Sequence, residues 1–146
     1  MTSPDWVLTA LQLDNARHNK QITEALQIYT AIIDPEYGWQ KHPTVNRWRP
    51  NKEALLVYGM IMYAIWRKKL HDGLRGGKLD HKSGEKIFEL LNKITTKIQY
   101  PEWPEEVYAS HRACLLAKDY DYYSQFGWKE KPTPPVNGKW PYVWVV

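Results

Sequence analysis

The stretch from residue 5 to residue 33, DWVLTALQLDNARHNKQITEALQIYTAII, holds neither proline nor glycine. So long a run without a helix breaker favours one continuous helix. Asp34 then ends the helix, because a residue that precedes proline disfavours the helical conformation. The apolar residues of its second half share one helical face: Ile22, Ala25, Leu26, Tyr29 and Ile33. The sequence thus predicts a long amphipathic helix whose apolar face needs partners.

Three further segments, at about residues 51–70, 85–98 and 106–118, also carry helical patterns. The first is apolar around most of its circumference, which predicts a buried central helix with Asn51 as its N-cap. Residues 71–84 are rich in glycine and predict a mobile loop, and a short helical turn follows near residues 119–128. The proline-rich end predicts an extended tail whose aromatic side chains pack back on the body. We therefore predict an all-α fold, a compact single-domain bundle of about four helices with an extended aromatic C-terminal tail.

Composition narrows the classes of partner. The chain has 146 residues and a net charge of +4, which permits a nucleic acid partner without requiring one. Eight Trp and ten Tyr beside two Phe favour half-buried positions and surfaces that stack on flat groups. The single cysteine, Cys114, excludes a disulfide framework, no Cys/His spacing is typical of zinc, and no apolar run could span a membrane. Since MTSPDW is no signal peptide, we expect a cytoplasmic monomer that uses no metal, no cofactor and no membrane.

One face of the first predicted helix is polar. At about 100° per residue, five side chains fall within an arc of about 120°: Arg17, Lys20, Gln21, Glu24 and Gln27. One interpretation is a solvated surface with an ion pair between Lys20 and Glu24. The other is a DNA-facing site with Glu24 as its acid or base. The pattern alone leaves both open.

Two other segments allow the same pair of interpretations. In GWQKHPTVNRWRP, residues 38–50, His42 is a structural hydrogen-bonding residue or a phosphate contact, and Trp39 and Trp48 cover the core or stack on bases. Its prolines exclude one continuous helix, so we expect a surface loop. In ASHRACLLAK, residues 109–118, His111 and Arg112 brace a neighbouring helix or grip backbone phosphates.

Three ordered blocks resemble a known family. They are LDNARHNKQITEALQIYTAI, GWQKHPTVNRWRPNKEALLVYGMIMY and YASHRACLLAKDYDYYSQFGW, followed by the ending PYVW. Together they resemble the pyrimidine-dimer DNA glycosylase family, also called endonuclease V, and more closely its bacterial and phage branch. The resemblance covers most of the chain, with residues 71–100 as a variable insertion in a single glycosylase-like domain of residues 1–146.

The resemblance implies a DNA glycosylase with abasic-site lyase activity, which removes a damaged or modified base from double-stranded DNA. The family's chemistry uses the N-terminal amine and a glutamate on the first helix, which correspond to Thr2, once Met1 is removed, and Glu24. Lys20 is the alternative amine. Founding members of the family place arginines where this chain has Thr23 and Gln27. Their absence weakens the case for a pyrimidine dimer as substrate and leaves a modified pyrimidine open. The implied DNA contacts are Arg17, Gln21, Gln27, Trp39, Lys41, His42, Arg47, Trp48, Arg49, His111, Arg112 and Lys118.

Two other classes of function stay open at this point. A non-catalytic DNA-binding module on the same helical scaffold explains the basic and aromatic residues without chemistry. A helical adaptor that binds protein through its Trp and Tyr surface explains the aromatic residues but not the arrangement of Lys20, Gln21 and Glu24.

Overall fold

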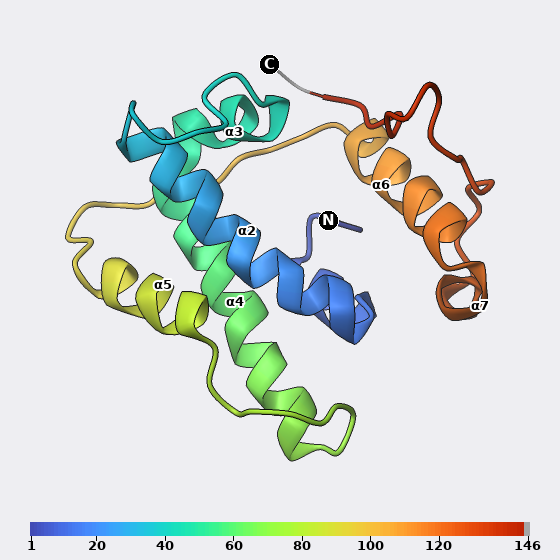
Figure 1. The fold of residues 1–146 in the computed structure, drawn as a ribbon, viewed down its shortest axis with the longest axis horizontal. Helices are drawn as coiled ribbons and strands as arrows, with labels where there is room; N and C mark the ends of the chain where they lie inside the picture. The colour runs from blue at the N-terminus through green and yellow to red at the C-terminus, as the bar shows by residue number, and fades with distance from the viewer. Residues whose placement is uncertain (145–146) are drawn as a thin grey trace.

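The computed structural model describes residues 1–144, which form helices joined by loops (Figure 1). In chain order the elements are α1 (Trp6–Gln12), α2 (Asn15–Ile33), α3 (Pro43–Trp48), η1 (Arg49–Asn51), α4 (Lys52–His71), α5 (Lys82–Asn92), α6 (Glu105–Lys118), α7 (Tyr120–Tyr123) and η2 (Ser124–Phe126). Within the described residues no strand forms, and one isolated bridge joins Val136 to Lys139. The all-α prediction is confirmed. The expected count of about four helices was low, because α1, α3 and α7 are separate short helices.

Helix α4 lies at the centre of the body and packs against α1, α2 and α5. Its buried side chains include Leu55, Leu56 and Met62, so the predicted buried central helix is confirmed. Gly59 lies where α4 meets both neighbours, since a Cβ there would come within 3.1 Å of Ala25 and 2.8 Å of Ile87. The absence of a side chain at Gly59 thus permits the close approach of three helices.

The prediction of one helix over residues 5–33 was wrong. The helix breaks between α1 and α2, where Leu13 is extended with φ −68° and ψ 137°. Asp14 caps α2 by accepting a hydrogen bond from the Arg17 amide, and its own amide donates to the Tyr123 hydroxyl at 3.2 Å. An aspartate side chain competes with the helix for backbone donors, so a cap with a tertiary partner ends the helix without proline or glycine.

Other boundaries differ from the prediction in smaller ways. The loop over residues 38–50 contains α3, which begins at Pro43 and is capped by the Nδ1 atom of His42. Helix α5 ends at Asn92 and not near residue 98. Asn51 precedes α4 as predicted, but its side chain donates to the Gln99 carbonyl and does not cap the helix. Ile33, expected on the apolar face of α2, is 51% exposed at the helix end.

Helix α6, α7 and the tail form the other side of the molecule, and the start of the chain lies between them and α2 (Figure 1). The tail returns along α6 through two hydrogen bonds, from the Thr133 amide to the Ala113 carbonyl at 3.0 Å and from the Val143 amide to Ser110 Oγ at 3.0 Å. The predicted packing of the aromatic tail on the body is confirmed. Across residues 1–144, none of the helices has both the length and the apolar character that crossing a membrane requires.

The contact between α4 and α5 gives a stability test. A Cβ at Gly84 would lie 2.4 Å from Tyr63 Cγ, at the rigid base of the ring, so Gly84→Ala forces α5 away from α4. We expect a loss of about 1–3 kcal/mol in the free energy of unfolding, measured by urea denaturation. Gly76→Ala is the matched control, because a Cβ there meets nothing within 4 Å and should change stability by less than about 0.5 kcal/mol. Equal stability of the two variants would contradict the packing assigned to Gly84.

Candidate active site

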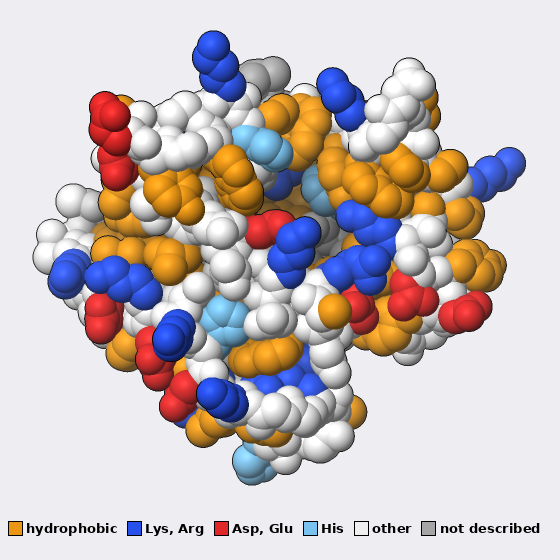
Figure 2. Space-filling view, viewed as in Figure 1, with side chains coloured by type: hydrophobic (Ala, Val, Ile, Leu, Met, Phe, Trp, Pro, Cys, Tyr) orange, Lys and Arg blue, Asp and Glu red, His pale blue; other side chains and the backbone are white. Residues whose placement is uncertain are grey.

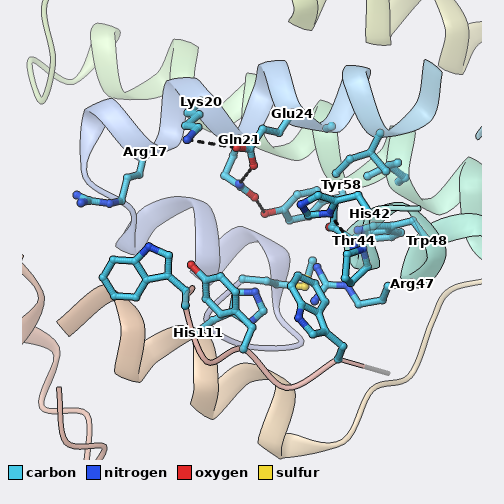
Figure 3. Close-up of a pocket in the computed structure, with 18 of the residues that line it drawn as sticks. Arg17, Lys20, Gln21, Glu24, His42, Thr44, Arg47, Trp48, Tyr58 and His111 are labelled. Atoms are coloured by element: carbon cyan, nitrogen blue, oxygen red, sulfur yellow. Dashed lines mark hydrogen bonds and ion pairs between the residues drawn. The ribbon is translucent and has the colours of Figure 1, made fainter. Parts of the chain in front are cut away.

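A cavity of about 660 Å³ lies between α2, α3, α6 and the tail. Figure 2 shows it as a hollow near the middle of one face, and Figure 3 shows the side chains that point into it. Its volume is typical of a site for a small molecule or a single nucleotide. Nine of the residues predicted from sequence line it: Arg17, Lys20, Gln21, Glu24, His42, Arg47, Trp48, His111 and Lys118.

Glu24 is held by two neighbours on its own helix. Gln21 Nε2 donates to Glu24 Oε2 at 3.0 Å, and Lys20 Nζ lies 3.6 Å from Glu24 Oε1. The Tyr58 hydroxyl in turn donates to Gln21 Oε1 at 2.6 Å, which fixes the orientation of the amide (Figure 3). Lys20, Gln21 and Glu24 of this polar face therefore form a connected network that lines the cavity, and Lys20, 73% exposed at its side chain, lies at its outer edge.

The amine of the first residue lies in the same cavity. Met1 is 7% exposed, and burial lowers the pKa of its amine to about 5, with the charges of Arg47 and Lys118 acting in the same direction and Glu24 opposing them. An amine with that pKa is neutral at pH 7 and therefore nucleophilic. A neutral amine beside a carboxylate is equipped for imine formation, with the carboxylate moving protons.

Thr2 lies directly behind this amine and is 1% exposed. Its nitrogen donates to Thr9 Oγ1 at 3.2 Å, and its hydroxyl donates to Gln12 Oε1 at 2.6 Å. Arg112 Nη1 donates to the Thr2 carbonyl at 2.8 Å. The main chain at the start of the protein is thus fixed on both sides, by α1 and by α6.

Arg47 reaches the cavity from α3. Its guanidinium carbon lies 4.5 Å from the ring centroid of Trp103 and 5.3 Å from that of Trp144. The residue is 8% exposed, and burial lowers the pKa of its guanidinium to about 10, which leaves it cationic at neutral pH. Its Nε and Nη1 atoms have no hydrogen-bond partner among the described residues.

Helix α6 contributes His111 and Lys118, and the tail covers both. His111 Nδ1 bonds to the Val107 carbonyl at 2.7 Å, and the ring stacks on Tyr142 with centroids 4.6 Å apart. Burial, with the nearby amine and Arg47, holds the pKa of His111 well below its usual range, so the imidazole is neutral and carries its proton on Nδ1. Lys118 Nζ donates to the Tyr142 hydroxyl at 2.7 Å and lies 4.6 Å from the centroid of Trp140; burial lowers its pKa.

Several predicted residues lie outside the cavity lining. Arg112 is committed within the protein, since its guanidinium bonds Glu130 at 2.6 Å and Glu105 at 2.5 Å. Arg49 is exposed and donates to the Gln40 carbonyl at 2.8 Å. Lys41 is exposed, and Trp39 is 46% exposed with φ +71°, a strained conformation for a bulky residue. Gln27, one turn beyond Glu24, is not among the residues that line the cavity.

Sequence reasoning missed part of the lining. The missed residues are Met1, Thr44, Tyr58, Lys139, Trp140, Tyr142 and Trp144. Tyr58 was hidden among the apolar residues of α4, where nothing in the pattern sets it apart. The ending PYVW was noticed as a motif, but only the return of the tail along α6 reveals its place in the cavity.

The described residues contain no group of three or more His, Cys, Asp or Glu side chains arranged to hold a metal ion. Five Lys and Arg side chains and one carboxylate, Glu24, occur among the described residues that line the cavity. The cavity therefore combines an amine, a carboxylate and an excess of positive charge.

Comparison with known proteins gives a match to a family over part of the chain. Residues 2–72 match the family model described as pyrimidine dimer DNA glycosylase. No curated protein and no solved structure gives a significant match. The matched residues run from the start of the chain through α4 and include Glu24, Arg47 and Tyr58, whereas the resembling block on α6 and the tail lies outside them. Residues 2–72, just under half of the chain, are thus similar to the pyrimidine dimer DNA glycosylase family.

Proposed function

We propose that the protein excises a damaged or modified pyrimidine from duplex DNA and then cleaves the abasic site through a Schiff base on its N-terminal amine. The observation that carries this proposal is the buried amine, held neutral in the cavity that also contains Glu24. The family match supports the glycosylase step, and the amine supports the lyase step.

In the proposed reaction the neutral amine attacks C1′ of the nucleotide in the cavity. The bond from C1′ to the base breaks, and the base leaves with the electron pair and takes up a proton. The bond from C1′ to O4′ then opens, the nitrogen gives up its remaining excess proton, O4′ gains one, and the imine forms. Loss of a proton from C2′ expels the 3′ phosphate, and water hydrolyses the imine to restore the amine.

Glu24 serves these steps in two ways. As a carboxylate it stabilises positive charge that develops on the sugar, and it moves protons during ring opening and β-elimination. Its bond from Gln21 Nε2 fixes the position of one carboxylate oxygen and leaves the other paired only with the exposed Lys20. That second oxygen is the one free to turn to the substrate.

We assign the amine to Thr2 after removal of Met1. Met1 lines the same cavity as Glu24 and is 7% exposed, so its removal makes room for a sugar. The Thr2 nitrogen, now 3.2 Å from Thr9 Oγ1, then becomes the amine, and burial of Thr2, which is 1% exposed, favours the neutral form of that amine. Lys20 is less suited, since a side chain that is 73% exposed has no burial to favour its neutral form.

Basic side chains lie on the surface from which a DNA duplex would enter this cavity. Arg17, Lys20 and Lys139 line it and reach solvent, and Lys41 and Trp39 are exposed on the loop before α3. Extruding a base costs a few kcal/mol, which contacts of this kind recover through phosphates and stacking. The strained backbone and the exposed indole of Trp39 support the proposal that this residue contacts DNA.

Borohydride trapping tests the chemistry directly. Incubated with a duplex that carries one abasic site, the protein should form a reduced covalent adduct, and mass spectrometry should place it on the N-terminal residue. Glu24→Gln should slow strand cleavage by about 10²- to 10⁴-fold and change duplex affinity only severalfold.

Lys20→Arg is the matched control, because it keeps the charge beside Glu24 and removes only the lysine amine. Turnover close to that of the unsubstituted protein is expected. An adduct on Lys20 would replace the proposed nucleophile. Duplex binding with no adduct and intact DNA would leave a non-catalytic DNA-binding module.

The pKa of the amine predicts the pH profile. Burial lowers the pKa of the Met1 amine to about 5, and we expect burial to lower the pKa of the Thr2 amine in the same direction. The rise of kcat/KM on abasic DNA should therefore lie below the ordinary α-amine pKa of about 7.7–8.0, with a level region in the upper part of the range from about pH 6.5 to 8.5. An ordinary lysine nucleophile, with a pKa near 10.4, would instead give a rise of about tenfold per pH unit across that range. Steady-state rates at constant ionic strength decide between the two profiles.

A further inference from the structure

Arg47 is a buried charged residue of the cavity whose lost hydration is not offset by an ion pair among the described residues. It is 92% buried, being 8% exposed, and two of its three nitrogens have no hydrogen-bond partner among the described residues. The aromatic rings of Trp103 and Trp144 cover it, and the two phenols that interact with its charge, Tyr58 and Tyr108, are neutral at pH 7. No carboxylate within residues 1–144 pairs with this guanidinium.

An arrangement of this kind is costly in a protein without its ligand. A buried cation that lacks a partner loses its hydration without recovering it, and each unpaired donor adds to the loss. Arg112 shows the contrast, since it is also largely buried but is paired with Glu105 and Glu130. Arg47 therefore indicates a negatively charged group that enters the cavity with the substrate.

The other cations of the cavity are placed differently. Arg17, Lys20 and Lys139 reach solvent at the mouth, where a DNA backbone passes. Lys118 is bonded to Tyr142 and stacked on Trp140. Backbone phosphates thus have partners at the mouth, whereas Arg47 lies deeper, among indoles suited to a flat base. The anion that reaches Arg47 is one attached to the base.

From this geometry we infer that the cavity selects a pyrimidine whose ring carries an anionic substituent, a carboxylate or a phosphate, which the unpaired guanidinium of Arg47 binds. A planar guanidinium bonds two oxygens of either group at once. The inference rests on the proposed function, because it requires that a nucleotide from DNA occupies this cavity.

Binding measurements test it without turnover. Duplexes of one sequence carry 5-carboxyuracil, its uncharged analogue 5-carbamoyluracil, or a tetrahydrofuran abasic analogue. A second pair carries phosphorylated or free 5-hydroxymethyluracil. A 2′-fluoro group on the sugar of each base-bearing nucleotide prevents excision. The full-length protein should bind each anionic base about 10- to 100-fold more tightly than its neutral counterpart.

Arg47→Met should abolish this discrimination, because methionine fills the space between the indoles without a charge. Arg49→Met is the matched control: it removes an exposed arginine outside the cavity lining, so any loss of duplex affinity should be equal for charged and neutral bases and the discrimination should persist. Equal affinity of the unsubstituted protein for charged and neutral bases overturns the inference, and that comparison needs no variant. Discrimination that survives in a folded Arg47→Met protein overturns it as well.

The tetrahydrofuran duplex separates the two sources of an anion. If Arg47 binds a backbone phosphate, Arg47→Met weakens all duplexes equally, including this one, and lowers the slope of log K against log salt concentration by about one. That result also overturns the inference. Every measurement in this test is a binding affinity, so a negative result overturns the inference without contradicting the proposed Schiff-base chemistry. Conversely, if the trapping experiment gives no adduct, the preference for an anionic base can still be measured.

Discussion

The cavity depends on how Arg112 holds the start of the chain against α6. This one guanidinium bonds the Thr2 carbonyl, Glu130 and Glu105, and thereby joins the first residues, helix α6 and the segment after η2. Charge-assisted bonds in this number are strong and directional. With Thr2 also bonded to α1, the main chain is held on both sides of a position from which Met1 lines the same cavity as Glu24.

Part of the positive charge in the cavity comes from elements other than the helix of Glu24. The family resemblance expects arginines beside the glutamate, where this chain has Thr23 and Gln27. Arg47 on α3 and Lys118 on α6 lie in the same cavity instead. Both lower the pKa of the Met1 amine, so charges from α3 and α6 act on a group at the start of the chain.

The aromatic residues divide between the floor of this cavity and its cover. Trp48 packs beneath it, with its centroid 4.9 Å from that of Trp103 and 5.7 Å from that of Tyr58. Trp140, Tyr142 and Trp144 cover it from the tail, which is bonded to α6 through the Thr133 amide, the Val143 amide and the Tyr142 hydroxyl. The excess of Trp and Tyr over Phe follows from these positions, because each ring is apolar on its face and can bond at its edge.

The sequence by itself determined the helical class, the central place of α4 and the polar face of α2, because these depend on spacing within one segment. It also indicated the family through three blocks and the tail, of which the match covers the first two blocks. Only the tertiary structure decided the break at Asp14, since its cap depends on Tyr123, which lies 109 residues away. The site was decided in the same way: the amine, Glu24, Arg47 and the tail come from distant segments. The lowered pKa of the amine and the unpaired donors of Arg47 both result from burial. Burial depends on the packing of distant segments, so no local sequence pattern predicts it.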